Sequence, residues 1–381
     1  MKFPNLTNDD FRCILFVYMR KDKKMNTRCF GVDIYRISAM FMITALHVNN
    51  QYCRLLNETL PVFHYCFGVI VEYFCFAGVN CFAMLSGWLM GERAGEYDRK
   101  WGYKTISFAA KIVLWGLLLY LVVFLFLPGG RGYDFNIKAT FIPIVGFWWY
   151  INAYCGLLIF MPLLCKGLSK ISLRELAILS GCMFFAFSIL PMISPLTAEL
   201  SLRNGFSMIW LIICFIYGAA LRKFSPQILC IKRINYILTA ICFLSVLIPS
   251  AVHLLAGDRR LMNYLSPFCV LQAATMLLLM AQINISGQKM IRVISFISTN
   301  SLGIYLLHCY PYFWNNFICR KNPAIYPLPQ EILLLSAMIL LLMSGGVVVN
   351  FIIEKIYQYC RFDFIIRRMF AIGKNDTDSR Q

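Results

Sequence analysis

The chain has 381 residues, of which 60% are hydrophobic and only 14% are charged, and its mean hydropathy is +0.66. Soluble domains carry about 25% charged residues, so this composition excludes an ordinary soluble protein. A net charge of +18 would suit a nucleic-acid-binding protein, but the charges lie in short segments between long apolar runs. The composition therefore predicts an all-α protein that crosses a membrane many times.

Ten apolar runs come close to the roughly 20 residues that a helix needs to cross the hydrocarbon core of a bilayer. In chain order they cover about 31–50, 65–90, 104–127, 145–165, 174–194, 206–221, 236–255, 264–283, 296–317 and 332–353. The second run is long enough to tilt or to hold a kink. We predict a multi-pass bundle of about ten transmembrane helices in a cell (plasma or inner) membrane, with the lipid bilayer as its surroundings.

Lys and Arg are distributed unequally between the two sides of this bundle. With a cytosolic N-terminus, that side holds 26 of the 36, the opposite loops hold 8, and Arg36 and Lys111 lie inside spans. Cytosolic loops of membrane proteins are enriched in these residues, so both termini are predicted to be cytosolic, and the charge requires no nucleic-acid partner. We expect a basic cytosolic segment (1–30), a transmembrane domain (31–353) and a cytosolic tail (354–381) that is first interfacial and then disordered.

The 16 cysteines do not indicate a metal centre or a disulfide framework. The sequence contains no CxxC pair, and most of the cysteines lie within the apolar runs. A buried free cysteine behaves as a small hydrophobic residue, whereas metal sites and disulfide frameworks are recognised by characteristic cysteine spacings. We therefore predict no bound metal and no bound cofactor.

The first apolar run carries three ionisable residues, Asp33, Arg36 and His47. Such residues are costly within a membrane and usually face a protein interior. Eleven residues separate Arg36 from His47, which places both on one stripe of a helix, about 16 Å apart along its axis, with Asp33 close to the same stripe. This arrangement indicates a functional path across the membrane, and the alternative is a structural ion pair with an unrelated buried histidine.

The predicted orientation assigns depths to the other polar residues of the spans. Asp33 and Arg36 share the cytosolic half with Ser86 and Gly87, which end the second run. His47 shares the outer half with Glu72, and Tyr305 and His308 lie from the middle of the membrane outward. Two levels of polar groups suit an enzyme that takes one substrate from each side, and they suit a transporter equally. Structural roles also remain open: polar pairing near the headgroups for Glu72, and a hydrogen bond across helices for Tyr305 and His308.

Four segments together resemble the acyltransferase-3 family of integral-membrane acyltransferases, especially its surface-polysaccharide O-acyltransferase branch. They are Arg36-x10-His47 with Asp33 before it, GVNCFAMLSGWLM, FWWYINAYCGLLIFMPLL and NSLGIYLLHCYP, and they extend over residues 33–311. Each segment is weakly specific alone, but the four in order make the resemblance specific. One departure is Asn80, where many members of the family have an acidic residue.

The resemblance implies transfer of an acyl group, acetyl by default, from cytosolic acetyl-CoA or another acyl-CoA to a hydroxyl of a glycan or lipid-linked sugar. On this interpretation His47 is the general base or an acyl carrier, and Arg36 binds the donor phosphates or the thioester oxyanion. Asp33 orients Arg36, and Ser86 and Gly87 line the donor entrance. Glu72, Tyr305 and His308 bind or orient the acceptor, with Glu72 holding His47. The alternatives are a transporter or flippase for a lipid-linked sugar, and a non-catalytic scaffold.

Overall fold

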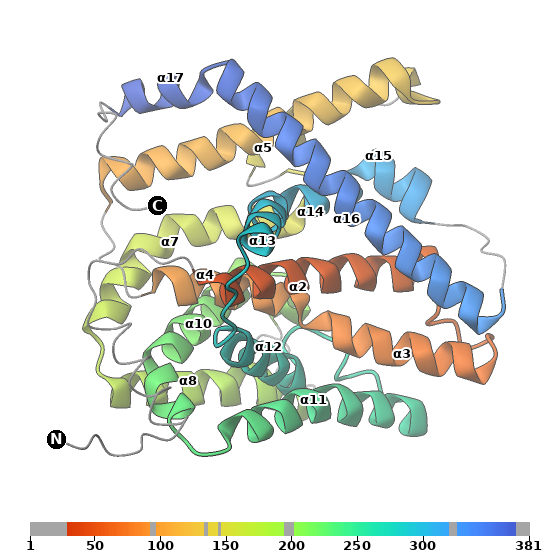
Figure 1. Cartoon of the computed structure of the whole chain (residues 1–381), viewed down its shortest axis with the longest axis vertical. Helices are drawn as coiled ribbons and strands as arrows, with labels where there is room; N and C mark the ends of the chain where they lie inside the picture. The colour runs from red at the N-terminus through yellow and green to blue at the C-terminus, as the bar shows by residue number, and fades with distance from the viewer. Residues whose placement is uncertain are drawn as a thin grey trace.

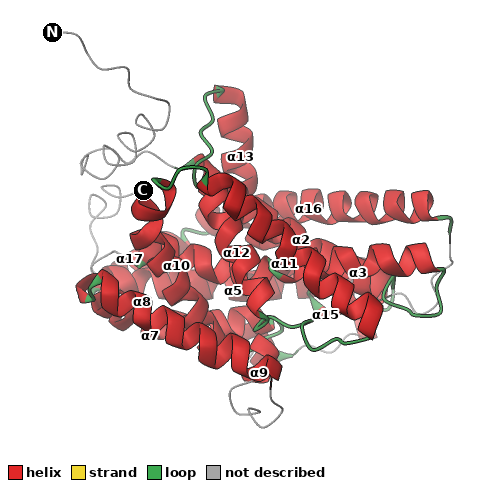
Figure 2. Ribbon diagram, turned by 90° about the horizontal axis from the view of Figure 1, so that it is seen from below, coloured by secondary structure: helices red, strands yellow, loops and turns green. Residues whose placement is uncertain are grey.

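The computed structural model describes residues 29–91, 97–132, 136–143, 146–193, 202–319 and 326–370. Their regular structure is entirely helical, as Figure 2 shows, which confirms the predicted fold class. The longer helices are α2 (Phe30–His47), α3 (Val62–Phe76), α4 (Gly78–Met90), α5 (Arg99–Phe126), α7 (Trp149–Lys170), α8 (Leu173–Phe184), α10 (Met208–Leu229), α11 (Ile234–Ala256), α12 (Pro267–Met280), α13 (Gln288–Asn300), α14 (Leu302–His308), α16 (Leu328–Tyr359) and α17 (Phe362–Met369). The predicted segment 1–30 lies almost entirely outside the described residues, as does the tail beyond 370.

Shorter helical pieces complete the described part of the chain. They are the π-helical segments η1 (Val48–Tyr52), η4 (Phe185–Ile189) and η6 (Trp314–Ile318), the 3-10 turn η2 (Gly130–Gly132), and α6 (Ile137–Phe141), α9 (Leu190–Ile193) and α15 (Pro311–Phe313). The π-helical segment η1 comes directly after His47, and η6 follows α15, six residues after His308. Such π-bulges are frequent at functional sites.

Seven described helical segments are long and apolar enough to cross a membrane, and the bent pair α13–α14 would make eight. The bend between α13 and α14 is 44°. The other two predicted spans correspond to α2, whose polar residues lower its hydropathy, and to α12, which has 14 residues. The second span runs from Val62 to Met90, with a one-residue interruption of the helix at Ala77 between α3 and α4.

Helix α2 lies in the middle of the bundle, as Figure 1 shows, with α5 and α17 above it in that view, α11 and α12 below, and α16 running diagonally past its right end. The neighbouring α3–α4 segment is 72% buried over its most apolar stretch, against 17% for α8–α9 and 22% for α16. The outer helices therefore direct apolar residues such as Phe243, Leu333 and Leu340 outward, where lipid would contact them.

Glycines allow the central helices to approach closely. A Cβ at Gly87 on α4 would lie 1.8 Å from the carbonyl oxygen of Phe215 on α10, and a Cβ at Gly218 on α10 would lie 1.8 Å from that of Met84 on α4. Helices α14 and α16 meet in the same reciprocal way at Gly303 and Gly346. Small residues at helix contacts are typical of membrane bundles, where close packing replaces the hydrophobic effect.

The described part of the tail is helical. Helix α16 continues past the predicted boundary at 353 to Tyr359, and α17 then packs against α5. The Tyr103 hydroxyl on α5 donates to Asp363 on α17, and the Phe370 ring covers Gly102. The amphipathic segment predicted after Glu354 is therefore a helix attached to the bundle.

Candidate active site

The polar stripe of α2 faces the ninth predicted span along its length. Arg36 contacts Ser298 on α13, and His47 contacts His308 at the end of α14. The residue numbers rise together along both segments, so α2 and α13–α14 run side by side in the same direction. The predicted stripe of Arg36 and His47 therefore corresponds to one shared interface, with a polar cluster at each end.

The first cluster joins Asp33, Arg36 and Ser298. The Ser298 hydroxyl donates to Asp33 Oδ1 at 2.6 Å and accepts from Arg36 Nη1 at 3.1 Å, while Arg36 Nη1 lies 3.7 Å from Asp33 Oδ1. The Asp33 side chain is 6% exposed and that of Arg36 is 28% exposed. Asp33 thus contacts the guanidinium directly and through Ser298, and its role in orienting Arg36 for a donor stays a prediction.

The second cluster is a histidine pair. His47 Nδ1 lies 2.9 Å from His308 Nε2, and His308 Nδ1 lies 2.5 Å from the carbonyl oxygen of Ile304. Because a carbonyl oxygen only accepts, the neutral His308 carries its proton on Nδ1, and its Nε2 accepts from Nδ1–H of His47. This series of hydrogen bonds leaves the lone pair of His47 Nε2 unused, because no described residue hydrogen-bonds to that nitrogen. The His47 and Trp314 rings also meet in a T-shaped contact, with the ring centroids 4.9 Å apart and Trp314 belonging to η6.

Glu72 is buried and 1% exposed, but it makes no hydrogen bond to His47. Its carboxylate accepts from Asn49 Nδ2 at 2.9 Å and from Asn50 Nδ2 at 3.2 Å. Both amides belong to η1, which begins at the residue after His47. The direct contact expected between Glu72 and His47 is therefore absent, since Glu72 instead fixes the segment that follows the histidine.

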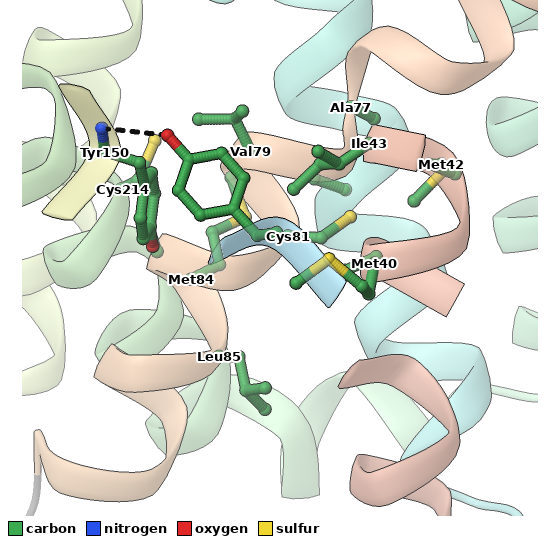
Figure 3. Packing of buried hydrophobic residues seen from close by; sticks show 14 of the residues in the cluster. Met40, Met42, Ile43, Ala77, Val79, Cys81, Met84, Leu85, Tyr150 and Cys214 are labelled. Carbon is green, nitrogen blue, oxygen red and sulfur yellow. Dashed lines mark hydrogen bonds between the residues drawn. The ribbon is translucent and has the colours of Figure 1, made fainter. Parts of the chain in front are cut away.

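A cavity brings all four motif segments together. Its lining residues are Met40, Ile43 and His47 of α2, Val79 and Phe82 of α4, Trp149 and Tyr150 of α7, Leu302 and Tyr305 of α14, and Tyr264. Figure 3 shows Met40, Ile43, Val79 and Tyr150 in the buried packing around this space, and its dashed line starts at the Tyr150 backbone N–H, which donates to the Tyr305 hydroxyl at 3.4 Å. His47 and Tyr305 are the predicted site residues on this cavity wall.

The other predicted residues lie outside that lining. The Ser86 hydroxyl donates to the carbonyl oxygen of Phe82 at 3.2 Å, one turn back along α4. Gly87 lies where α4 crosses α10, and this close helix contact alone explains why the residue is a glycine. The donor-binding roles of Ser86 and Gly87 stay predictions.

Asn80, the departure from the family pattern, is fully buried, and both polar atoms of its side-chain amide form hydrogen bonds. Its amide nitrogen donates to the Tyr264 carbonyl at 2.8 Å, and its Oδ1 accepts from Trp210 Nε1 at 2.9 Å. A carboxylate could accept from Trp210 but could not donate to Tyr264. An asparagine therefore suits this position in this chain, where it ties α4 to α10 and to the segment before α12.

The comparison with known proteins decides the family. The model of the acyltransferase-3 family, described as an acyltransferase domain, matches residues 30–355. The chain belongs to the acyltransferase-3 family. No curated protein matches the chain. The acyltransferase is thus a multi-pass membrane transferase, and family membership favours the enzyme over the transporter and scaffold alternatives.

Sequence reasoning missed several residues that complete the site of this acyltransferase. Ser298 is an ordinary serine within the ninth run, and only its position opposite the first span reveals its two charged partners. Asn49 and Asn50 lie two and three residues after His47, so their polarity within an apolar run was an available signal. Cys309 lies beside His308, and its sulfur comes within 3.6 Å of His47 Nδ1, which no local spacing indicates.

Proposed function

We propose that the acyltransferase moves an acyl group, acetyl by family default, from a cytosolic acyl-CoA to a hydroxyl of a cell-surface glycan or lipid-linked sugar. The observation that carries this proposal is the hydrogen-bond chain from the Ile304 carbonyl through His308 to His47. It leaves a basic nitrogen on a residue that lines the cavity where the four motif segments meet.

As general base, His47 Nε2 takes the proton of the acceptor hydroxyl while the hydroxyl oxygen attacks the thioester carbonyl. The positive charge that develops on His47 is shared through its Nδ1–H bond to His308, a positioning residue anchored on Ile304. When the tetrahedral intermediate collapses, the carbon–sulfur bond breaks and the CoA thiolate takes the proton from Nε2. As an acyl relay, the same Nε2 would attack the thioester first and then pass the acyl group to the hydroxyl.

The Asp33–Arg36–Ser298 cluster is the proposed donor end. Asp33 and Ser298 hold the Arg36 guanidinium in place, and arginine binds phosphate oxygens with directional hydrogen bonds. The donor would then extend about 16 Å along α2 to bring its thioester to His47. Met40 and Ile43, which continue the stripe from Arg36 to His47, line the cavity along part of that distance.

The acceptor end is assigned to the aromatic part of the cavity. Trp149, Tyr150 and Tyr305 contribute flat apolar rings, and the hydroxyl of Tyr305 is fixed by the Tyr150 backbone. Rings of this kind offer both an apolar face and a polar group, which is what the face and the hydroxyls of a sugar require. Glu72 supports this end indirectly through Asn49 and Asn50.

The test uses membranes that contain the wild-type chain or His47→Ala, supplied with acetyl-CoA labelled in the acyl group. We expect label in the glycan and glycolipid fraction with wild type and a loss of about 10²–10⁴-fold with His47→Ala. His253→Ala is the matched control, because His253 is also buried but bonds Tyr65 away from the cavity. Equal labelling by wild type and His47→Ala would remove His47 from the reaction.

A further inference from the structure

The histidine pair has a third potential metal ligand beside it. Cys309 Sγ lies 3.6 Å from His47 Nδ1, which itself lies 2.9 Å from His308 Nε2, and the three atoms all lie within 4.8 Å of one another. In tetrahedral zinc sites the Zn–N distance is about 2.0–2.1 Å and the Zn–S distance about 2.3 Å, so neighbouring ligand atoms are roughly 3.3–3.6 Å apart. Two of the observed separations therefore already lie within a few tenths of an ångström of a metal site.

The surroundings of the trio also suit a metal. Histidine ligands usually donate their other ring N–H to a carbonyl or carboxylate, which fixes the ring and its tautomer. His308 does this through Nδ1, which donates to the Ile304 carbonyl, so its Nε2 lone pair is directed to the cluster. Imidazole nitrogens and thiolates are the ligand types that bind zinc, and zinc sites with three protein ligands keep a fourth position open. His47 lines the cavity, which supplies space for that position.

We propose that His47, His308 and Cys309 form a zinc-binding site whose occupancy switches off acyl transfer. The inhibitory effect rests on the proposed function, whereas metal binding itself does not. Zinc binds the lone pairs of His47 Nδ1 and His308 Nε2 and the thiolate of Cys309, and the thiol releases one proton as the zinc–sulfur bond forms.

Binding reverses the tautomer of His47. In the metal-free enzyme the single ring proton of neutral His47 is on Nδ1, which donates to His308, and Nε2 has the free lone pair. A neutral imidazole that binds metal through Nδ1 carries its proton on Nε2. The nitrogen that would accept the hydroxyl proton then has no lone pair left, so the zinc-bound enzyme has neither a base nor an acyl carrier at this position.

Direct binding is measured on the purified full-length acyltransferase after treatment with a chelator. Co²⁺ is the probe, because tetrahedral cobalt with a thiolate ligand gives visible bands and a sulfur-to-metal charge-transfer band. We expect these bands with wild type, their loss with Cys309→Ala, and their displacement by Zn²⁺. Cys242→Ala is the matched control, since Cys242 is also a partly buried free thiol but lies on α11, and it should keep the bands.

Inhibition is measured in parallel as acyl transfer against Zn²⁺ concentration. With each protein compared with its own metal-free rate, Cys309→Ala should require at least about tenfold more Zn²⁺ than wild type for half inhibition. Absence of the charge-transfer band in wild type, or its persistence in Cys309→Ala, would overturn the site. Equal zinc sensitivity of the two proteins, or activation by zinc, would overturn the inhibitory role. Cobalt binding by a wild-type protein that transfers no acyl group would support the site and contradict the proposed function alone.

Discussion

At the scale of single residues, His308 is the group that decides which nitrogen of His47 is basic. Its Nε2 accepts from His47, and its own proton is fixed on the Ile304 carbonyl. Replacement by leucine would leave Nδ1–H of His47 without this acceptor and free the ring to turn. On the proposed function, His308 is therefore a positioning residue, and its loss should affect the chemical step through His47.

We expect His308→Leu to lower kcat by at least about tenfold, less than the loss of about 10²–10⁴-fold expected for removing the base itself. His308→Gln should recover part of that loss, because the amide oxygen can accept from His47 while the amide nitrogen donates to Ile304. Initial rates of acyl transfer at saturating donor distinguish the variants. A leucine variant with wild-type kcat would show that His308 does not position the base.

Ser298 tests the donor end in the same way. Its hydroxyl bonds both Asp33 and Arg36, and hydrogen bonds to charged groups contribute about 1.5–3 kcal/mol. We expect Ser298→Ala to raise the KM for acyl-CoA about tenfold with kcat nearly unchanged, the signature of lost ground-state binding. Ser250→Ala is the control, because that buried hydroxyl bonds only its own helix. A fall in kcat at unchanged KM would place Ser298 outside donor binding.

The sequence was sufficient to identify candidate functional residues, but it did not predict which residues they contact. The eleven-residue spacing of Arg36 and His47 was sufficient to predict one functional stripe, because helical periodicity is local. The partners Ser298 and His308 lie more than 260 residues away, and no period in the sequence reveals which helices meet. For the same reason Glu72 was matched to His47 by depth alone, whereas the structure pairs it with Asn49 and Asn50.

At the scale of helices, hydropathy located the spans but not their breaks. The break at Ala77 and the 44° bend before Leu302 occur where other backbones come close: a Cβ on Gly78 would meet the Ala39 carbonyl at 2.9 Å, and one on Gly303 would meet that of Gly346 at 2.6 Å. These are properties of the assembled bundle. The α4–α10 crossing is close in both directions, and α4 carries Val79 and Phe82 of the cavity wall, so this crossing should affect the stability of the site.

We expect Gly218→Ala to destabilise the acyltransferase by about 1–3 kcal/mol, because its new methyl group overlaps the Met84 carbonyl and the helices must separate. Gly181→Ala on α8 is the matched control, since a Cβ there meets no described atom within 4 Å and alanine favours a helix. Thermal unfolding in detergent should give a lower Tm for the first variant and an equal or higher Tm for the second. Equal Tm values for Gly218→Ala and wild type would mean that the α4–α10 contact is looser than described.

At the scale of the whole molecule, α2 and α13–α14 form one parallel unit with different chemistry at its two ends. The guanidinium cluster at one end suits an anionic donor, and the histidine pair at the other lies where α4, α7 and α14 enclose the cavity. Because the ends are about 16 Å apart, each could receive its substrate from a different side of the membrane. This division has meaning only for one orientation of the bundle, in which the Arg36 end faces the cytosol.

The distribution of Lys and Arg predicts that orientation, with both termini cytosolic. Epitope tags placed after Gln381 and after Gly257, which ends α11, should therefore lie on opposite sides of the membrane. In sealed vesicles with the outer face exposed, added protease should remove only the tag after Gly257, and permeabilisation should make both tags sensitive. The reverse result would place Arg36 near the outer face. A cytosolic acyl-CoA could then not reach the guanidinium cluster, and the donor would have to be a different molecule.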